Sequence, residues 1–166
     1  MEPSTTGERY TGYLDSPLGP LAVTATVTGI VAVRYVPAKD DPSSQPPVCL
    51  RQALAQLAEY FAGRRRTFSL PLLPHGTVFQ TAVWAALVHI PFGQTASYRE
   101  IAARIDRPRA VRAVGHANGC NRLNILIPCH RVVGADGSLT GYGGGLWRKQ
   151  WLLDHEKAVL NAASSC

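Results

Sequence analysis

Apolar and polar residues alternate along residues 10–36 in the manner of β-strands. Leu21 and Val23 fall on one face, and a second apolar run begins at Ile30, after a Thr-Gly turn at residues 28–29. Alternation of this kind between short turns is typical of antiparallel strands that bury one face. We therefore predict a small antiparallel sheet near the N-terminus.

A helix is predicted after the proline-rich, loop-like residues 37–47. Apolar side chains recur there at intervals of three and four residues, which places them on one face, and Gly63 ends the pattern. Residues 64–74 are basic and contain proline, so we predict a boundary there between an N-terminal domain, 1–74, and a second domain, 75–166. The predicted buried face of the helix consists of Leu50, Leu54, Leu57 and Phe61.

Three short helices are predicted in the second domain. Thr77 with Gln80, and Ser97 with Glu100, have the spacing of capping boxes, in which side chains and backbone at a helix start satisfy each other. The third helix is predicted to begin at Pro108, because proline suits the first helical position, and to end at an Asn-Gly pair. The positions predicted to face inward are Phe79, Val83, Leu87, Ile90, Ile101, Ile105, Val111 and Val114.

Arginine is concentrated in this second domain. Of the 17 Lys and Arg residues in a chain of formal net charge +6, 14 are arginine, and seven of them lie from Arg99 to Arg131, against two acidic residues. Arg109, Arg112 and His116 share the outward face of the third helix, and the two short helices together predict a helix-turn-helix. Nucleic acid is the predicted partner. A solvated basic face and ordinary helix packing are the alternatives.

Cys129 is the candidate nucleophile. The apolar residues 125–127 predict a short buried strand that leads directly into Cys129, which is followed by His130 and Arg131. Neighbouring cations lower the pKa of a thiol, whereas a structural cysteine usually lies among apolar residues. We therefore expect Cys129 to be reactive.

The sequence leaves open how His130 serves this thiol. Neighbouring residues of a regular strand point to opposite faces, so either the backbone turns at Pro128 or a water relays the proton. A carboxylate usually orients a catalytic imidazole. Glu156, which is predicted to lie at the end of an apolar helix, is the candidate. That helix carries Leu146, Trp147, Trp151, Leu152 and Leu153.

The remaining cysteines and glycines predict no metal or phosphate site. Cys49, Cys120 and Cys166 form no CxxC pair, and we assign them no role. The glycine-rich residues 141–145 lack the ending of a phosphate-binding loop and predict close approach to a flat group. No secretory or membrane-spanning pattern is present, so we expect an intracellular protein, cytoplasmic if bacterial and nuclear if eukaryotic.

The reactive segment Ile127–Val132 resembles that of the O6-alkylguanine-DNA alkyltransferases, and further blocks agree in order and spacing over about residues 77–157. The N-terminal half is similar only loosely, at residues 16–21 and 60–63. The other matching residues are Phe79-Gln80, Val83-Trp84, Ile90-Pro91, Gly93, Thr95, Ser97-Tyr98, 110–115, Asn118-Gly119, Asn121, Gly141-Tyr142 and Gly144-Gly145.

The resemblance implies an α+β fold. A small N-terminal antiparallel sheet with a covering helix would form a ribonuclease H-like domain, and a helical domain would hold the helix-turn-helix and the strand with the reactive cysteine. It further implies direct reversal of DNA alkylation, in which O6-alkylguanine is flipped out through the minor groove and its alkyl group passes irreversibly to Cys129, once per molecule. No cofactor is implied. The partner would be double-stranded DNA, bound by a monomer, with cooperative binding left open.

The resemblance also assigns roles to individual residues. Cys129, a water, His130 and Glu156 would form a proton relay. Arg112 would fill the vacated base stack, and Tyr98 would help to rotate the nucleotide. Asn121 would act as a hinge, and the carbonyls of Cys129 and Val132 would accept from the guanine amine. The loop residues Tyr142, Gly143 and Gly144 would close over the base, and the DNA contacts would be Arg109, Arg112, Ala113 and Arg131.

Some residues depart from the family pattern. No cysteine precedes Cys49, so the N-terminal zinc site of some members is not expected, and we predict no metal. Asn118 and Asn124 stand at pocket-wall positions where some members have Met and Pro, which leaves the tolerance of bulky alkyl groups open. Gly143 replaces a serine, but a backbone contact there would survive.

Two other classes of function compete with this one. A DNA-binding regulator with a redox-sensitive cysteine would explain the basic helices and a reactive thiol, and it would undergo reversible oxidation without alkyl transfer. A cysteine hydrolase would turn over and would not need the arginines.

Overall fold

The computed structural model describes residues 7–165 and divides into two compact units. Among these residues, the first unit contains residues 7–75 together with 122–126, and the second contains residues 76–121 and 127–165. The predicted division into 1–74 and 75–166 did not include the return of residues 122–126 to the first unit. The fold is α+β, as the sequence predicts.

The first unit is built on a three-stranded antiparallel sheet in the order β1 (Tyr10–Leu14), β2 (Leu21–Ala25) and β3 (Ile30–Tyr35). The central strand β2 is buried along its whole length. Its register places Leu21 opposite both Leu14 and Tyr35. The alternating pattern therefore predicted these strands correctly.

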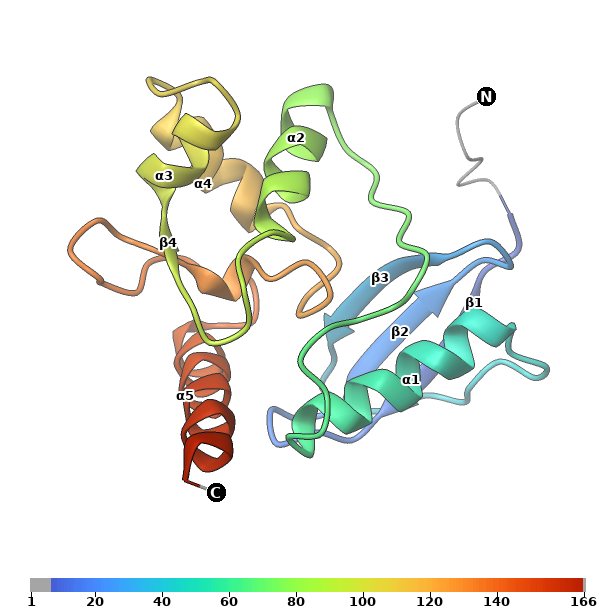
Figure 1. Ribbon diagram of the computed structural model, residues 1–166. Coiled ribbons are helices and arrows are strands. Elements are labelled where there is room, and N and C mark those ends of the chain that lie inside the picture. The colour runs from blue at the N-terminus through green and yellow to red at the C-terminus, as the bar shows by residue number, and fades with distance from the viewer. Residues whose placement is uncertain (1–6, 166) are drawn as a thin grey trace. The chain divides into compact units, whose positions relative to one another are not determined.

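Helix α1 (Val48–Phe61) packs on the sheet (Figure 1). Leu50 and Leu57 are fully buried, as predicted, and Tyr60 is buried as well. The helix approaches β1 so closely that a Cβ atom at Gly12 would lie 2.7 Å from Leu54 Cδ1. Glycine at position 12 thus permits the close contact between helix and strand.

The edge strand β3 is covered by two loop segments of the same unit. Ile30 N–H donates to Pro71 O, and Leu73 N–H donates back to Ile30 O, both at 2.8 Å. Farther along the strand, Val33 N–H donates to Arg122 O at 2.9 Å, and Asn124 Nδ2 donates to Val33 O at 2.8 Å. These bonds satisfy backbone groups that an edge strand would otherwise expose, which explains why residues 122–126 belong to the first unit.

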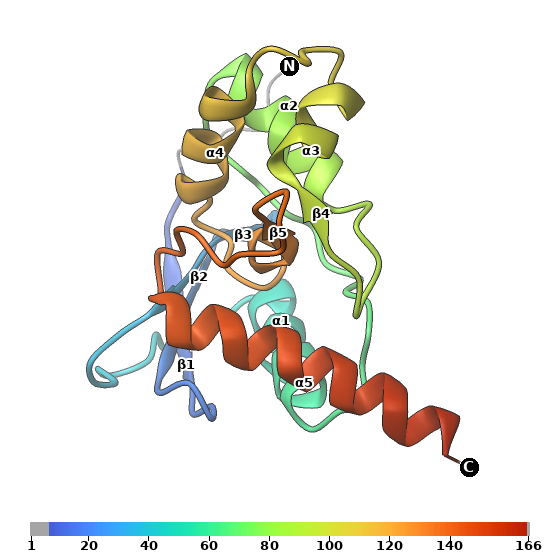
Figure 2. The same cartoon turned by 90° about the vertical axis from the view of Figure 1, so that its left-hand side faces the viewer.

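Three short helices of the second unit gather in one cluster, whereas a fourth, α5, extends as a long separate helix (Figure 2). Both capping boxes are confirmed, at Thr77 and at Ser97. The elements of this unit are α2 (Val78–Leu87), β4 (Ala96–Ser97), α3 (Tyr98–Arg104), α4 (Val111–Gly119), the 3-10 helix η1 (Cys129–Arg131), β5 (Val132–Val133) and α5 (Leu146–Ser164).

Helix α4 begins at Val111 and not at Pro108, so the predicted start is wrong. Ala110 N–H donates to Arg107 O at 2.9 Å, which closes a β-turn with Pro108 at its second position. The fixed φ of proline suits that turn as well as it suits a helix start. Arg109 therefore lies in the turn, outside the helix, and Val111 is only half-buried.

Residues 125–127 are buried as predicted, but they do not form a strand. Ile125 has a φ of 72°, and Leu126 N–H donates to Asn124 O at 2.8 Å across it. A β-branched residue in the left-handed region is strained and persists only where its surroundings impose it. The apolar run thus predicted burial correctly. It did not predict the local structure, because the chain turns within the buried segment.

Helix α5 continues well beyond the predicted end, to Ser164, so that Glu156 lies within it. Leu152 and Leu153 are buried, whereas Leu146 and Trp147, at the start of the helix, are 48% and 57% exposed. Within residues 7–165, no helix is both long enough and apolar enough to cross a membrane.

Candidate active site and nucleic-acid interface

Cys129 begins the 3-10 helix η1, directly after a sharp turn at Pro128. Pro128 has φ −80° and ψ 62°, and Cys129 N–H donates to Ile127 O at 2.8 Å, which is the geometry of an inverse γ-turn. The backbone therefore does turn at Pro128, and a water between the thiol and the imidazole stays a prediction. The cysteine is only 4% exposed.

Two asparagines hold this turn. Asn121 Nδ2 donates to Ile127 O at 2.9 Å, and Asn118 Nδ2, from α4, donates to Cys129 O at 3.3 Å. The backbone N–H of Val132 also donates to Cys129 O. Asn121 thus connects the end of α4 to the reactive turn. The resemblance implies that Asn121 acts as a hinge at this position.

The environment of Cys129 raises the pKa of its thiol, contrary to the sequence-based expectation. Burial has the largest effect, because it disfavours the thiolate. A hydrogen bond from Asn121 and the charge of Lys149 lower the pKa but do not outweigh burial. The two flanking residues that prompted the prediction, His130 and Arg131, are occupied elsewhere.

Both flanking residues bind the buried carboxylate of Glu156. His130 Nε2 lies 2.7 Å from Glu156 Oε2, and the Arg131 guanidinium donates to both carboxylate oxygens, at 2.8 and 3.0 Å. Gly93 N–H donates to Glu156 Oε1 at 3.0 Å. Burial alone would raise the pKa of Glu156, but these hydrogen bonds and charges hold it well below its usual range.

The prediction that Arg131 contacts DNA is wrong. Its side chain is buried, and its third donor, Nη1, reaches Ile90 O at 2.8 Å. Arg131 is therefore the counter-ion of Glu156. Through its bond to Ile90 O, it also connects η1 with the segment that follows α2.

His130 presents one free ring nitrogen. Burial lowers its pKa, and Glu156 offsets this only in part, so the ring is neutral near pH 7. Because ionised Glu156 can only accept, Nε2 must carry the hydrogen, which leaves Nδ1 as a lone-pair acceptor. Nδ1 is buried and has no hydrogen-bond partner among the described residues. Such a nitrogen is suited to accept a proton.

Lys149 is a site residue that the sequence analysis missed. It is fully buried, and its ammonium donates to Thr140 O at 2.9 Å and lies 5.9 Å from the ring centroid of Tyr98. Burial lowers the pKa of Lys149, and its charge acts on Cys129. A detectable signal existed, because Lys149 stands seven residues before Glu156, on the helix face that Leu152 and Leu153 bury.

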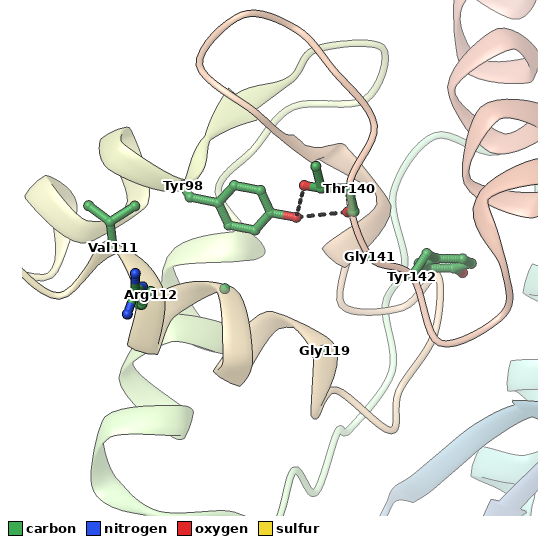
Figure 3. A pocket seen from close by; sticks show the side chains of 8 residues that line it. Tyr98, Val111, Arg112, Gly119, Thr140, Gly141 and Tyr142 are labelled. Carbon is green, nitrogen blue, oxygen red and sulfur yellow. Dashed lines mark hydrogen bonds between the residues drawn. The ribbon is translucent and has the colours of Figure 1, made fainter.

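A pocket of about 650 Å³ opens beside α3 and α4 (Figure 3). The Tyr98 hydroxyl donates to Thr140 O at 3.0 Å and accepts from Thr140 Oγ1 at 3.1 Å, so that it holds the loop opposite the helices. Lys149 donates to the same carbonyl. The lining residues are Tyr98, Val111, Arg112, Gly115, Gly119, Thr140, Gly141 and Tyr142.

The pocket unites some predicted site residues and omits others. Tyr98, Arg112 and Tyr142 line it, whereas Cys129 and Val132 are buried and are not among its lining residues. In the closing loop, Gly143 is exposed, and Gly144 is buried with its carbonyl accepting from Arg148 Nη1 at 2.8 Å. The glycines at 115 and 119 of α4, which the sequence did not single out as pocket residues, complete the wall.

The exposed side of α4 carries Arg112, Ala113 and His116. Arg109 is also exposed, in the turn that precedes α4. Helices α3 and α4 pack against each other and against α2, as in a helix-turn-helix. A polyanion would therefore meet arginines at the N-terminal end of α4, beside the pocket.

The other cysteines lie apart from this chemistry. The Cys49 thiol is buried in the first unit and donates to Thr26 O at 3.2 Å, and Cys120 lies 3.6 Å from His116 Nε2. Cys166 falls outside the described residues. Within the part of the chain that is described, no group of three or more His, Cys, Asp or Glu side chains could hold a metal ion. Asn124, assigned by resemblance to the pocket wall, binds β3 in the first unit instead.

Fold and site together define a two-unit protein in which a helix-turn-helix adjoins a buried thiol and a histidine–glutamate pair. Residues 9–74 match the family model described as the ribonuclease-like domain of 6-O-methylguanine DNA methyltransferase, and residues 78–158 match its DNA binding domain. The chain belongs to the 6-O-methylguanine DNA methyltransferase family.

Relatives and solved structures agree over nearly the whole chain. The methylated-DNA–protein-cysteine methyltransferase of Methanosarcina barkeri is 43% identical over 91% of this chain and 99% of its own length. A crystal structure of the Mycobacterium tuberculosis O6-methylguanine methyltransferase superposes with a TM-score of 0.82 at 44% identity, and covers 91% of this chain and 94% of that chain. The M. tuberculosis protein OGT in complex with DNA gives 0.80 at 44% identity, over 89% and 93%.

Proposed function

We propose that this protein repairs alkylated DNA by direct reversal. It takes the alkyl group from the O6 atom of an alkylated guanine in duplex DNA onto Cys129, irreversibly and once per molecule. The observation that carries the proposal is the combination of a buried cysteine with a neighbouring histidine that is hydrogen-bonded to Glu156 and whose second ring nitrogen has no partner among the described residues. Membership of the family supports it, as does the similarity to a methyltransferase structure that contains DNA.

The transfer is a displacement at the alkyl carbon. The bond from Cys129 sulfur to carbon forms while the bond from carbon to O6 breaks, and the electron pair of the broken bond stays with guanine. The proton that leaves the thiol neutralises the departing base, so the products are neutral guanine and a thioether. A thioether carries no exchangeable disulfide sulfur, so thiol exchange cannot restore the cysteine.

His130 is the base that this reaction needs. Because burial raises the pKa of Cys129, the resting side chain is a thiol and must lose its proton as the sulfur attacks. The free Nδ1 of His130 first accepts that proton through one water, and Glu156 stabilises the transient imidazolium. The imidazolium then returns the proton by way of the water to the departing guanine. The buried ammonium of Lys149 stabilises the developing thiolate.

A base within a stacked duplex cannot reach Cys129, which is 4% exposed, so the damaged nucleotide must leave the helix. Extrusion of this kind costs a few kcal/mol, and less for a poorly paired lesion. Arg112 on exposed α4 fills the vacated stack from the minor groove, and the small Ala113 permits close approach. Tyr98 guides the nucleotide, and the loop Tyr142–Gly144 closes over the base.

Intact-mass measurement tests the nucleophile. The purified protein is incubated with a duplex that contains one O6-methylguanine, and the gain of methyl groups is counted. We expect one methyl per molecule for the wild type and for Cys120→Ala, which removes the half-buried thiol beside His116. Cys129→Ala should gain none while it still binds the duplex. Methylation of Cys129→Ala would overturn the assignment, and tight binding by an unmethylated wild type would favour a regulator that only recognises the lesion.

Arg112→Ala separates base flipping from chemistry. We expect the variant to lose at least tenfold in the rate of transfer from duplex DNA and to react normally with the free base O6-methylguanine, because the free base needs no extrusion. Arg109→Ala, in the neighbouring turn, should weaken duplex binding without this difference between the substrates. Equal losses of Arg112→Ala on both substrates would remove its role in flipping.

A further inference from the structure

The loop that lies opposite α4 across the pocket is rich in glycine. Four of the six residues 140–145 are glycine, and Gly141 and Gly145 have positive φ values of 49° and 93°. Glycine has more backbone freedom to lose than any other residue. A substrate that had to order such a loop on binding would bind more weakly, so contacts that fix the loop beforehand favour binding.

The first end of this loop is held at Thr140. The Tyr98 hydroxyl donates to the Thr140 carbonyl at 3.0 Å (Figure 3), and the Lys149 ammonium donates to the same carbonyl at 2.9 Å. The next two residues, Gly141 and Tyr142, line the pocket. These bonds therefore fix the loop where it joins the pocket wall.

The second end of the loop is held by Arg148. Its Nη1 donates to the carbonyl of the buried Gly144 at 2.8 Å, and Gly145 N–H donates back to Tyr142 O at 2.8 Å. Tyr142 thus lies between two anchored carbonyls, those of Thr140 and Gly144. Without the guanidinium of Arg148, the second of these two anchors would be lost.

The position of Arg148 in its helix is electrostatically unfavourable, which calls for an explanation. Helix α5 begins at Leu146, and its first turn contains no carboxylate, although Arg148 and Lys149 both stand near its start. The N-terminal end of a helix carries partial positive charge and favours anions. Both cations donate to carbonyl oxygens of the loop, and this contact accounts for their place at the start of α5.

An exposed tryptophan supports the guanidinium of Arg148. The side chain of Trp147 is 57% exposed, and Arg148 Cζ lies 4.6 Å from the centroid of its ring. A guanidinium is attracted to the face of an indole and stacks on it, which restricts the conformations of a long side chain. Trp147 therefore serves as a platform that keeps the Arg148 donor directed at Gly144 O.

We propose that Arg148, stacked on Trp147, is a positioning residue that holds the loop 140–145 in the conformation that receives the alkylated base. It acts through the loop and does not touch the reacting atoms. The inference rests on the proposed function and deepens it. It assigns to Arg148 a part in the capture of the base, whereas the neighbouring Lys149 also acts on the Cys129 thiol.

The test uses the free base O6-methylguanine, which needs neither extrusion nor contacts with phosphate, alongside the duplex. Arg148→Met should lower the rate constant of methyl transfer about tenfold with both substrates, the loss expected for one hydrogen bond from a charged donor. Arg112→Ala, by contrast, should slow only the reaction with the duplex. Lys157→Met removes a charge from the exposed side of α5 and should react like the wild type with both. Rate constants are compared, so an unfolded fraction changes only the amplitude.

Alkylation of Cys129 by iodoacetamide separates positioning from thiol chemistry. This small reagent does not need the loop, so Arg148→Met should not slow its reaction and should leave the midpoint of its pH profile in place. Arg148→Lys keeps a cationic donor and should recover part of the lost rate of methyl transfer. Trp147→Ala should slow methyl transfer from both substrates, but less than Arg148→Met.

Three results would overturn the proposal. They are a wild-type rate of Arg148→Met with the free base, a shifted iodoacetamide profile in that variant, and an Arg148→Lys variant that is as slow as Arg148→Met. Each of them leaves Cys129 as the methyl acceptor. A wild type that gains a methyl group from neither substrate contradicts the proposed function instead.

Discussion

Among the described residues of the second unit, Cys120 with His116 and Cys129 with His130 form two cysteine–histidine pairs, and they differ in burial and in what holds the histidine. Cys120 lies 3.6 Å from His116 Nε2, but His116 is exposed on α4 and Cys120, which caps the end of that helix, is only half-buried. Cys129 is buried, and the histidine beside it in sequence is fixed by Glu156. Proximity of a thiol to an imidazole is therefore a weaker indicator of a reactive cysteine than the groups that surround the pair. A base held in one tautomer and a buried ammonium near the sulfur distinguish the reactive pair.

The two pairs also differ in how far the polar groups around them depend on one another for hydrogen bonds. Around Cys129, the carboxylate of Glu156 receives donors from His130, Arg131 and Gly93, so removal of one group leaves others buried and unpaired. Around Cys120 the polar groups reach water. Substitutions around Cys129 should therefore lower the stability of the fold, and substitutions around Cys120 should leave it nearly unchanged.

The largest expected effect on stability is that of Glu156→Gln. Without the carboxylate, the buried guanidinium of Arg131 loses its counter-ion, and breaking a buried ion pair costs about 3 kcal/mol. Urea unfolding should show this loss in the free energy of unfolding, and methyl transfer should slow because His130 loses its orienting partner. His116→Gln is the matched change at the exposed pair and should alter stability by less than about 0.5 kcal/mol. Equal effects would mean that the two pairs do not differ as described.

Lys149→Met should affect reactivity more than structure. The ammonium lowers the pKa of Cys129, so its removal should raise that pKa further. A higher pKa makes the thiolate scarcer at pH 7, and methyl transfer should slow by up to about tenfold. The pH profile of alkylation by iodoacetamide should move to higher pH, which a purely structural loss would not produce. Lys157→Met, on the exposed side of α5, is the control and should leave the profile in place.

The smallest effect is a pH dependence of stability that belongs to His130. Its pKa is lowered by burial in the folded protein, so below the ordinary value near 6.5 the unfolded chain binds a proton that the folded protein does not. Stability from this group is therefore present above pH 6.5 and falls as the pH drops, by up to about 1.4 kcal/mol per pH unit.

Unfolding measured between pH 5 and 6.5 should show this slope in the wild type and in His116→Gln, and should lose it in His130→Gln. The interval lies above the ordinary pKa of Glu156, so the carboxylate stays ionised in both states. A slope that disappears in His116→Gln and persists in His130→Gln would reverse the comparison.

The sequence predicted the features that depend on neighbours along the chain. The capping boxes at Thr77 and Ser97 are local devices, and alternation in β1 to β3 follows from one buried face, so both were found. His130 and Glu156 form a hydrogen bond, as expected from the resemblance, although they are far apart in sequence.

The features that were missed depend on distant contacts. Ile125 turns with a positive φ because residues 122–126 bind β3, which no local pattern encodes. The basic residues Arg131 and Lys149 are buried because partners elsewhere in the unit receive them. The sequence therefore did not reveal that Arg131, expected from the resemblance to contact DNA, is buried. It also did not reveal that burial raises the pKa of Cys129 despite the cations beside it in sequence.

The central claim is that the two thiols differ, and peptide mapping tests it most directly. Wild-type protein treated with an excess of duplex containing O6-methylguanine is digested, and the peptides with Cys129 and Cys120 are resolved by mass spectrometry. We predict one methyl group on the Cys129 peptide, none on the Cys120 peptide, and no increase with time after one methyl per molecule. A methyl group on Cys120, or continued turnover, would contradict the account.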